Sequence, residues 1–417
     1  MLNKNIITYG CRLNIYESEV IQQHLEKAKL TNYILFNSCS VTNEAKKKVI
    51  DDIKKYKKKY PDKKIIVTGC ASQIDSKTFL SMNEVEHVIG NKEKMEFETF
   101  LKISNEKIKN KISNIMELKT IAPQFIESFK NHSRAFIQIQ NGCDHRCTFC
   151  TIPYGRGNSR SLPVDNIIEQ IKVLNEKGFN EIVLTGVDLT SYGPDLNEKV
   201  SLGKLVETII KSNKELKRLR LSSLDSIEID DLLFEILSSE KRIMPHFHLS
   251  MQSGDNMILK RMKRRHQREH AIDFCNKIKL IRPEVIFGAD LIAGFPTETD
   301  VMFHNTLKII DECDLTLLHI FPFSPMEKAP ASKMPQVPKH IIKERAKILR
   351  EKGQLKMKNK FKETVGKTLN VLTEKNSFGY SENYLKVKIS SKKYLKEGQI
   401  IPVKITGYNP NYLEATI

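Results

Sequence analysis

The residues with the clearest chemical potential are three cysteines that lie close together in the middle of the chain. Cys143, Cys147 and Cys150 form a C-x3-C-x2-C run in a sequence of 417 residues that holds only eight cysteines. Three thiolates on one short loop suit a [4Fe-4S] cluster, which is normally held by four cysteines, so that one iron is left open to another ligand. A zinc site is the alternative. It needs a fourth ligand, and His145, the nearest candidate, lies inside the three-residue gap.

Three further cysteines each end a short apolar, β-branched run in the first part of the chain. The runs are IITYGC (6–11), YILFNSC (33–39) and KIIVTGC (64–70). The charged amphipathic stretches 15–29 and 43–60 separate them and predict helices. Alternating strands and helices predict a parallel sheet, in which all strands end at the same edge. We therefore expect Cys11, Cys39 and Cys70 to converge and to hold a second cluster, the alternative for each being an ordinary buried cysteine.

Composition bounds the class of protein. With 40% hydrophobic residues the chain can bury a core, which excludes a largely disordered protein. Neither a signal peptide nor an apolar stretch of bilayer length is visible, so we expect a cytoplasmic protein without membrane association or a disulfide framework. Cys275 and Cys313 are accordingly interpreted as packing residues. The net charge of +18 indicates either a polyanionic partner or a lysine-rich proteome.

The middle of the chain alternates between strand-like runs and amphipathic helices such as 164–177 and 202–214. The six runs are AFIQIQ (135–140), EIVLTG (181–186), RLRLSS (218–223), HFHLSM (246–251), VIFGADLIAG (285–294) and LLHIFPFS (317–324). Six such units predict a partial (β/α)6 barrel, not the closed eight-stranded form. Reactive residues of such barrels lie at the carboxyl ends of the strands, where this chain has Asp188, Gln252 and Gly294.

The last part of the chain changes character. We predict a Lys/Arg-rich helix over 339–361 that leads away from the barrel, followed by a small all-β barrel made of short runs between glycines in 362–417. Nine lysines less five glutamates give this tail a charge of +4, which suits either a phosphate-facing domain or a solvated lysine surface. A second basic run, KRMKRRHQREH (260–270), follows the fourth strand and lies near the expected mouth of the site.

The three-cysteine loop resembles the cluster-binding loop of the radical S-adenosylmethionine superfamily, in which the open iron binds that cofactor. The longer string GCDHRCTFCTIPYGRGNSRS (142–161) is similar to the methylthiotransferase branch. The segments similar to the three auxiliary-cluster motifs of that branch are GCRLN (10–14), NSCSVT (37–42) and TGCASQ (68–73). The resemblance covers nearly the whole chain and implies three domains: an N-terminal parallel α/β domain (1–110), a radical S-adenosylmethionine core (131–361) and an RNA-binding TRAM β-barrel (362–417).

The resemblance also implies contacts. Phe149 matches the aromatic position beside the adenine of the cofactor, and Asp188, Gln252 and Gly294 lie in segments that would line the S-adenosylmethionine pocket. The cations that we expect to hold an RNA backbone are Lys263, Arg264, Arg265, Lys386 and Lys388. No catalytic side chain is predicted, because the two clusters and the cofactor carry the difficult chemistry.

The resemblance implies a reaction as well. One S-adenosylmethionine methylates a sulfur on the auxiliary cluster, and a second is cleaved to a 5′-deoxyadenosyl radical. The radical removes hydrogen from C2 of an adenine, and the methylthio group takes its place. Such an enzyme holds two [4Fe-4S] clusters and S-adenosylmethionine, and it needs a flavodoxin- or ferredoxin-type electron donor. The target base is expected in an unpaired tRNA anticodon loop, because C2 is inaccessible inside a duplex.

Three substrates are possible within this resemblance. Arg12-Leu13-Asn14 after the first cysteine resembles the branch that acts on N6-threonylcarbamoyladenosine at tRNA position 37, whereas the branch for N6-isopentenyladenosine more often has Gln-Met-Asn. A ribosomal-protein aspartate is disfavoured by the basic tail. The chain departs from the pattern at 326–328, where Met-Glu-Lys replaces an Arg-Gly-Thr-like turn. A non-catalytic iron-sulfur or RNA-binding protein is the alternative of another class, but it has no need of two complete cysteine triads.

Overall fold

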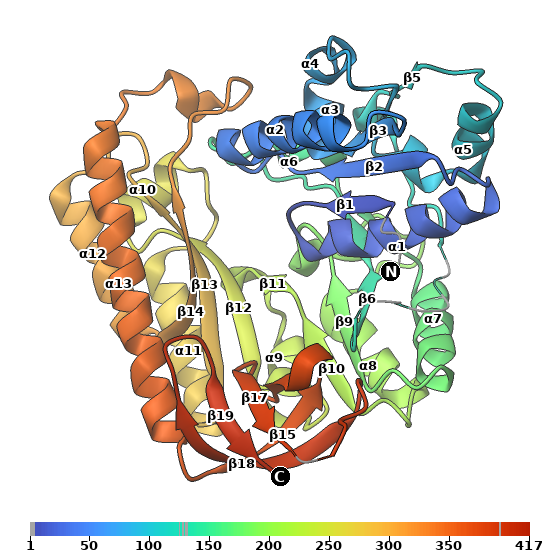
Figure 1. Ribbon diagram of the computed structural model, residues 1–417. Helices are drawn as coiled ribbons and strands as arrows, with labels where there is room; N and C mark the ends of the chain where they lie inside the picture. The colour runs from blue at the N-terminus through green and yellow to red at the C-terminus, as the bar shows by residue number, and fades with distance from the viewer. Residues whose placement is uncertain (1–4, 125, 127–128, 130–131, 392) are drawn as a thin grey trace.

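The computed structural model describes residues 5–124, 126, 129, 132–391 and 393–417, and its first unit is a parallel sheet (Figure 1). The sheet has the order β1-β2-β3-β4-β5. Its strands are β1 (Ile6–Thr8), β2 (Tyr33–Ser38), β3 (Lys64–Gly69), β4 (His87–Ile89) and β5 (Asn110–Lys111). Its helices are α1 (Arg12–Lys27), α2 (Asn43–Lys59), α3 (Cys70–Ile74), α4 (Ser76–Leu80) and α5 (Phe97–Ser104).

Strand β2 shows why this sheet is covered on both faces. All six of its residues are buried, and successive side chains point to opposite sides. Leu35 packs with residues of α1 and α5, while Ile34 and Phe36 pack with residues of α2 and α4. A strand buried on both faces reads as a continuous apolar run, which is what the sequence shows here. The predicted parallel α/β architecture is therefore confirmed.

The central unit is an open barrel of six parallel strands, split into two sheets with the orders β10-β9-β6 and β11-β12-β13-β14. The strands are β6 (Ala135–Gln138), β9 (Glu181–Thr185), β10 (Arg218–Leu221), β11 (Ser223–Leu224), β12 (His246–Gln252), β13 (Ile286–Ala293) and β14 (Leu315–Pro322). Because β10 and β11 are one run interrupted at Ser222, the seven segments form the six predicted strands. The short antiparallel pair β7 (Gln140–Asn141) and β8 (Arg160–Ser161) brackets the three-cysteine loop.

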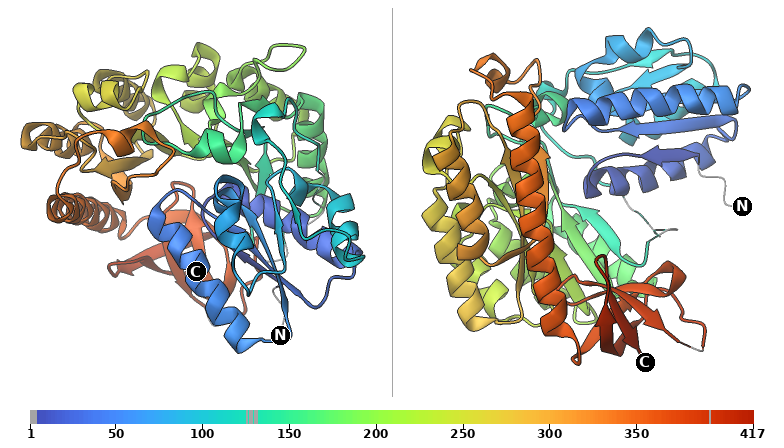
Figure 2. Two further views of the ribbon diagram at one scale, coloured as in Figure 1. Left: turned by 90° about the horizontal axis from the view of Figure 1, so that it is seen from above. Right: turned by 60° about the vertical axis from the view of Figure 1, so that its left-hand side comes forward.

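Helices form the outer layer of this barrel (Figures 1 and 2). They are α7 (Val164–Glu176), α8 (Leu202–Ser212), α9 (Asp231–Ser239), α10 (Asn256–Arg261), α11 (Arg268–Ile281), α12 (Asp300–Glu312) and α13 (Lys339–Thr364). The prediction that the basic helix leads away from the barrel is wrong, because α13 runs along β14 and covers it. Its buried stripe is Ile342, Ala346, Leu349 and Gly353. A Cβ on Gly353 would lie 3.1 Å from Leu318 Cδ1, so a small residue lets the helix come this close.

The C-terminal unit is a closed barrel with the order β15-β16-β17-β19-β18, as predicted from the glycine-punctuated runs. Its strands are β15 (Thr368–Thr373), β16 (Phe378–Ser381), β17 (Lys386–Ser390), β18 (Ile400–Tyr408) and β19 (Leu413–Thr416). It docks at the amino ends of the central strands (Figure 1). There Arg220 donates to the carbonyls of Ser381 and Glu382 at 2.9 Å each, and its Nε donates to Glu181 at 2.8 Å.

No helix among the described residues is both long and apolar enough to cross a membrane.

Candidate active site

The three-cysteine loop follows β7 at the carboxyl end of the first barrel strand. Gly142 has a φ of +77°, and a Cβ there would overlap the carbonyl of Asn158, so the turn before Cys143 requires glycine. Burial and the nearby Asp188 carboxylate raise the pKa of Cys143, and Cys150 lies within electrostatic range of it. Burial, with Cys147 as a neighbour, raises the pKa of Cys150 to about 12. The structure therefore brings the three thiols together, with Cys143 and Cys147 buried and Cys150 half-buried.

Polar side chains from two other strand ends surround this loop. The Nε2 of His145 lies 3.1 Å from Asp188 and 3.2 Å from Glu228, on the 3-10 helix η4 (Ser226–Glu228). Hydrogen bonds to these carboxylates raise the pKa of His145 to about 10, so the imidazole is positively charged at neutral pH. Asp188 also accepts a hydrogen bond from Cys143 Sγ at 3.5 Å. His145 thus pairs with carboxylates near the loop, which does not favour its interpretation as a fourth zinc ligand.

Arg264 is not on the surface, where a contact with an RNA backbone would require it to be. Lys263 has a φ of +57°, and this turn directs the next side chain inward, so that only 9% of it is exposed. Arg264 donates to Asp225 at 2.6 Å and to the Ser250 carbonyl at 2.9 Å, and its NH1 lies 3.8 Å from Cys147 Sγ. The expected contact of Arg264 with an RNA backbone is therefore corrected: its cation lies beside the cysteine loop.

Three of the residues expected to contact S-adenosylmethionine lie at the carboxyl ends of the same barrel. Phe149 packs against the apolar cluster that includes Met262 and Phe295. Gln252 ends β12 with a φ of +69°. Gly294 has a φ of +71°, and its N–H donates to Glu298 at 3.0 Å. Together with Asp188, which follows β9, these residues lie on the same side of the barrel as the cysteine loop.

Cys11, Cys39 and Cys70 converge from three strand ends of the N-terminal sheet. Burial and then the proximity of Cys70 and Cys11 raise the pKa of Cys39 to about 11. Cys11 is the N-cap of α1 and Cys70 is the first residue of α3. Gly10 has a φ of +86°, and a Cβ there would lie 2.7 Å from Cys39 Sγ, so glycine allows the first loop to approach the second.

The two cysteine triads lie on loops that touch each other. Helix α6 (Ile152–Arg156), which follows Cys150, packs against α3, which begins at Cys70. A Cβ on Gly155 would lie 3.4 Å from Cys70 Cβ, in ordinary contact. Asn91 Nδ2 donates to the Gly155 carbonyl at 2.5 Å and lies 3.8 Å from Cys70 Sγ. Sequence reasoning did not find this junction, because its parts are far apart in the chain.

A buried ion network lies behind the junction. Arg156 donates to Glu17 at 2.8 and 3.1 Å and to Asn14 Oδ1 at 2.6 Å, and Lys94 donates to Glu17 at 2.6 Å. Although burial opposes the charged form, Cys70 and Glu17 raise the pKa of Arg156, which stays a cation. Its charge lies within electrostatic range of both Cys70 and Cys11. The helix after one triad is therefore tied to α1, which begins beside the other triad.

The donor chemistry of both triads fits iron-sulfur clusters. All eight cysteines are free thiols. Burial and neighbouring anions raise the pKa of Cys39, Cys143 and Cys150, so their thiolate forms need a compensating positive charge. Metal ligation supplies this charge, and thiolates are the ligands that iron-sulfur clusters prefer. Cys275 and Cys313 are buried in the core of the central unit, as predicted for packing residues.

The other expected RNA contacts are cations at the surface, of which Lys263, Arg265 and Lys388 are exposed and Lys386 is half-buried. Lys263 and Arg265 face outward near the loop, and Arg265 pairs with Glu228 at 2.8 Å. On β17, Lys386 stands 4.6 Å from the ring centre of Phe378, and Lys388 stands 5.8 Å from the same ring. Phe378 itself is half-buried. Cations beside aromatic rings are the usual components of a surface that binds unpaired nucleic acid.

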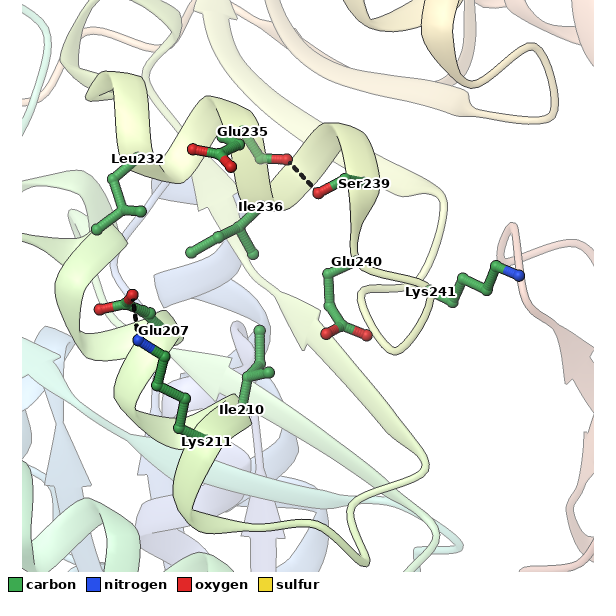
Figure 3. A pocket seen from close by; sticks show the side chains of 9 residues that line it. All are labelled: Glu207, Ile210, Lys211, Leu232, Glu235, Ile236, Ser239, Glu240 and Lys241. Carbon is green, nitrogen blue, oxygen red and sulfur yellow. Dashed lines mark hydrogen bonds and ion pairs between the residues drawn. The ribbon is translucent and has the colours of Figure 1, made fainter.

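A pocket of about 460 Å³ lies away from this site, between the outer helices α8 and α9 (Figure 3). Glu207 pairs with Lys211 at its wall, at 2.6 Å, and no cysteine lines it. We assign it no role in the chemistry of the cysteine loops.

Comparisons with known proteins agree with this geometry. Residues 137–310 match the model of the Radical SAM superfamily, and residues 3–90 match that of Uncharacterized protein family UPF0004. A solved structure of the radical S-adenosylmethionine methyltransferase TsrM from Kitasatospora setae has a TM-score of 0.57 at 13% identity, covering 76% of this chain and 72% of that one. At that identity the likeness shows the fold alone.

Sequence relatives are more specific. The "Threonylcarbamoyladenosine tRNA methylthiotransferase MtaB" of Rickettsia prowazekii is 51% identical over 100% of this chain and 98% of its own length. The protein of the same name from Aquifex aeolicus is 33% identical over 95% and 98%. A "tRNA-2-methylthio-N(6)-dimethylallyladenosine synthase" from Geobacillus thermodenitrificans is 31% identical over 96% of this chain and 80% of its length. Similarity at this level runs the length of the chain. This protein therefore belongs to the radical S-adenosylmethionine methylthiotransferases, in the threonylcarbamoyladenosine tRNA branch.

Proposed function

We propose that this protein attaches a methylthio group to C2 of N6-threonylcarbamoyladenosine at position 37 of tRNA. The observation that carries the proposal is the direct contact between two loops that each present three thiols, one at the edge of a parallel sheet and one at the mouth of a barrel. A reaction that joins sulfur transfer to radical chemistry needs both kinds of centre within reach of one base. The choice of N6-threonylcarbamoyladenosine as the substrate base is supported by the relatives, which are named as threonylcarbamoyladenosine tRNA methylthiotransferases.

The residues divide into three roles under this proposal. Cys143, Cys147 and Cys150 hold the cluster that binds S-adenosylmethionine, and Cys11, Cys39 and Cys70 hold the auxiliary cluster. When bound, the first cluster and its cofactor supply the one-electron cleavage that generates a carbon radical. Phe149, Asp188, Gln252 and Gly294 would line the cofactor pocket, with Arg264 placing a positive charge beside Cys147. Lys263, Arg265, Lys386 and Lys388 would hold the tRNA backbone.

The proposal has consequences for partners and organisation. Cleavage by a reduced cluster requires an external one-electron donor of the flavodoxin or ferredoxin type, and a tRNA substrate places the enzyme in the cytoplasm. The junctions at 110–131 and at 361–362 divide the chain into three domains under this proposal. Docking of the C-terminal barrel through Arg220 supports its role as an RNA-binding module fixed relative to the site.

The test is mass spectrometry of tRNA nucleosides from a bacterial host that lacks its own methylthiotransferases. Expression of this chain should yield 2-methylthio-N6-threonylcarbamoyladenosine. Appearance of the isopentenyl analogue instead would keep the chemistry and change the substrate. If neither nucleoside forms although both clusters are loaded, the proposal fails and the ribosomal-protein substrate becomes the next test.

Two variants separate the roles of the cysteine triads. We expect Cys147→Ala to abolish reductive cleavage of S-adenosylmethionine and formation of the product. Cys70→Ala should abolish the product as well, while the purified variant still releases 5′-deoxyadenosine under reductant. Cys313→Ser is the control, because Cys313 lies in the core away from both loops. Loss of 5′-deoxyadenosine in Cys70→Ala with an intact first cluster would contradict this division.

A further inference from the structure

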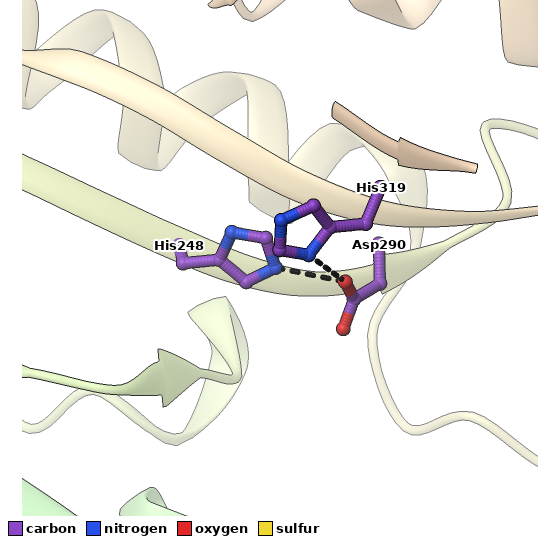
Figure 4. A group of neighbouring side chains, drawn as sticks. All are labelled: His248, Asp290 and His319. Atoms are coloured by element: carbon purple, nitrogen blue, oxygen red, sulfur yellow. Dashed lines mark hydrogen bonds and ion pairs between the residues drawn. The ribbon is translucent and has the colours of Figure 1, made fainter. Parts of the chain in front are cut away.

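A group of polar side chains lies inside the barrel and has no part in the roles above (Figure 4). His248 on β12, Asp290 on β13 and His319 on β14 come from three adjacent strands. Asp290 Oδ1 lies 2.9 Å from His248 Nε2 and 3.1 Å from His319 Nδ1, and the two rings are 4.8 Å apart. The alternate residues of these strands, such as Leu249 and Leu291, belong to the core under the outer helices. The polar group therefore faces the barrel interior.

The solvent exposure of the three side chains increases from His248 through Asp290 to His319. The side chain of His248 is 9% exposed, that of Asp290 is 23% exposed and that of His319 is 64% exposed. Although burial opposes ionisation, hydrogen bonds from the two imidazoles keep the pKa of Asp290 well below its usual range. An ionised carboxylate between two imidazoles, open at one end, is a polar surface that is accessible from the side of β14.

Arg12, the first residue of α1, adds a cation from the N-terminal unit. It directly follows Cys11, and its NH2 lies 3.3 Å from the hydroxyl of Tyr384 in the C-terminal barrel. Tyr384 stacks on His246, whose ring lies 6.5 Å from that of His248. The buried Nε2 of His246 has no hydrogen-bond partner among the residues that the structure describes. The region therefore has donors available as well as the carboxylate of Asp290.

A ligand that satisfies this region must carry both kinds of group. A carboxylate suits the Arg12 guanidinium and the imidazoles, and a hydroxyl or amide N–H suits the carboxylate of Asp290. An apolar ligand would desolvate these groups without replacing their bonds to water, which is unfavourable. Sites built on polar partners therefore reject analogues that lack them.

We propose that Arg12, His248, Asp290 and His319 bind the N6 substituent of the substrate base and select a hydroxylated, anionic acyl group over an apolar one. The inference rests on the proposed function, because the threonylcarbamoyl group carries a carboxylate, a hydroxyl and amide N–H groups. The placement agrees with this role. His248 lies four residues before Gln252 on β12, roughly 13 Å below the strand end at 3.3 Å per residue, and Arg12 adjoins a ligand of the auxiliary cluster.

The test compares the binding of two tRNAs that differ only at base 37, one with N6-threonylcarbamoyladenosine and one with plain adenosine. The cluster-loaded protein should bind the first more tightly at fixed salt. His319→Leu, Asp290→Asn and Arg12→Gln should each reduce this preference about tenfold, with iron content measured to verify folding. His319→Gln keeps an amide donor and should retain part of the preference. His340→Leu, on the exposed side of α13, is the control and should behave like the unaltered protein.

The outcomes separate the two proposals. If the unaltered protein makes the methylthio product but the variants keep its preference, or weaken binding of both tRNAs equally, the pocket is refuted and the function stands. If it shows neither product nor preference, both fail. The same three groups on β12, β13 and β14 can hold a divalent cation. Tight binding of Mn²⁺ to the cluster-loaded protein, seen by electron paramagnetic resonance and lost in His319→Leu, would also overturn the pocket.

Discussion

A single arginine connects the two halves of the candidate site. Burying the charges of Arg156 and Glu17 costs several kcal/mol in desolvation, which their attraction and hydrogen bonds offset. The network is therefore weak evidence of extra stability. The network instead fixes the position of α6 relative to α1. Moving the two helices apart would leave the charge of Arg156 or of Glu17 buried without a partner, which is strongly unfavourable.

Replacing Arg156 tests this constraint. In Arg156→Met, the Glu17 carboxylate keeps Lys94 but loses its guanidinium partner inside the core. We expect the free energy of unfolding to fall by about 3–5 kcal/mol, measured by anaerobic urea denaturation of the cluster-free protein. Arg350→Met, on the exposed side of α13, should change it by less than about 0.5 kcal/mol. A loss for Arg156→Met as small as that of the control would refute the constraint.

At the scale of elements, the joint between the barrels depends on one carboxylate. Glu181 on β9 lies within 4 Å of Arg134, Arg218 and Arg220. Arg134 also pairs with Glu374 at 2.8 Å, and Arg218 donates to the Asn370 carbonyl at 3.0 Å, both in the C-terminal unit. Glu181 therefore orients the arginines that the C-terminal barrel contacts.

This joint should weaken in acid. Although burial opposes ionisation, Arg220 and its neighbours lower the pKa of Glu181 to about 2, against roughly 4.3 in an unfolded chain. A depressed pKa stabilises the folded state above the unfolded value, and that contribution is lost as the pH falls from about 4.3 through 2. Its size is of the order of 3 kcal/mol.

Glu181→Gln is the variant that measures this contribution. It should be less stable at pH 7 and should lose less of its remaining stability between pH 5 and pH 3, as followed by urea denaturation at a series of pH values. Glu397→Gln, at an exposed site, is the matched control. An unchanged pH dependence in Glu181→Gln would show that the arginines do not depend on this carboxylate.

At the scale of the whole molecule, a net charge of +18 makes any association with RNA dependent on salt. We expect Lys386→Ala with Lys388→Ala to reduce the slope of log K against log salt for tRNA binding by about 1.4–1.8, since each phosphate contact contributes roughly 0.7–0.9. Lys343→Ala with Lys347→Ala, on the exposed side of α13, should leave the slope unchanged. If both double variants reduced the slope equally, the salt dependence of tRNA binding would reflect the total charge of the protein and not contacts made by Lys386 and Lys388.

Much of the architecture could be predicted from local pattern. Buried strands such as β2 read as apolar runs, and the convergence of three cysteines followed from the rule that parallel strands end together. The position of α13 did not follow, because its buried stripe is narrow and includes Ala346 and Gly353 among many lysines. Strand β16 is difficult to recognise from sequence because it is short and contains Gly379.

The chemistry around the cysteines was less predictable. The inward turn of Arg264 depends on the backbone at Lys263, and a basic run gives no sign of one residue that faces the other way. Arg156 and Glu17 are 139 residues apart, and Asp290 meets His319 only because two strands pair in that register. Such contacts belong to the tertiary fold. The Asp-Ser-Ile-Glu segment at 225–228 was the available signal for Glu228, since it directly follows a strand.

The reach of the C-terminal barrel back to Arg134, Arg218 and Arg220 has a consequence for biosynthesis. Contacts such as Arg134–Glu374 span 240 residues, so they form only when the last part of the chain has left the ribosome. All six cysteines of the triads lie within the first 150 residues and emerge long before. A barrel that folds within that interval would expose three arginines around one glutamate at its amino end, and such charges disfavour edge-to-edge association of strands.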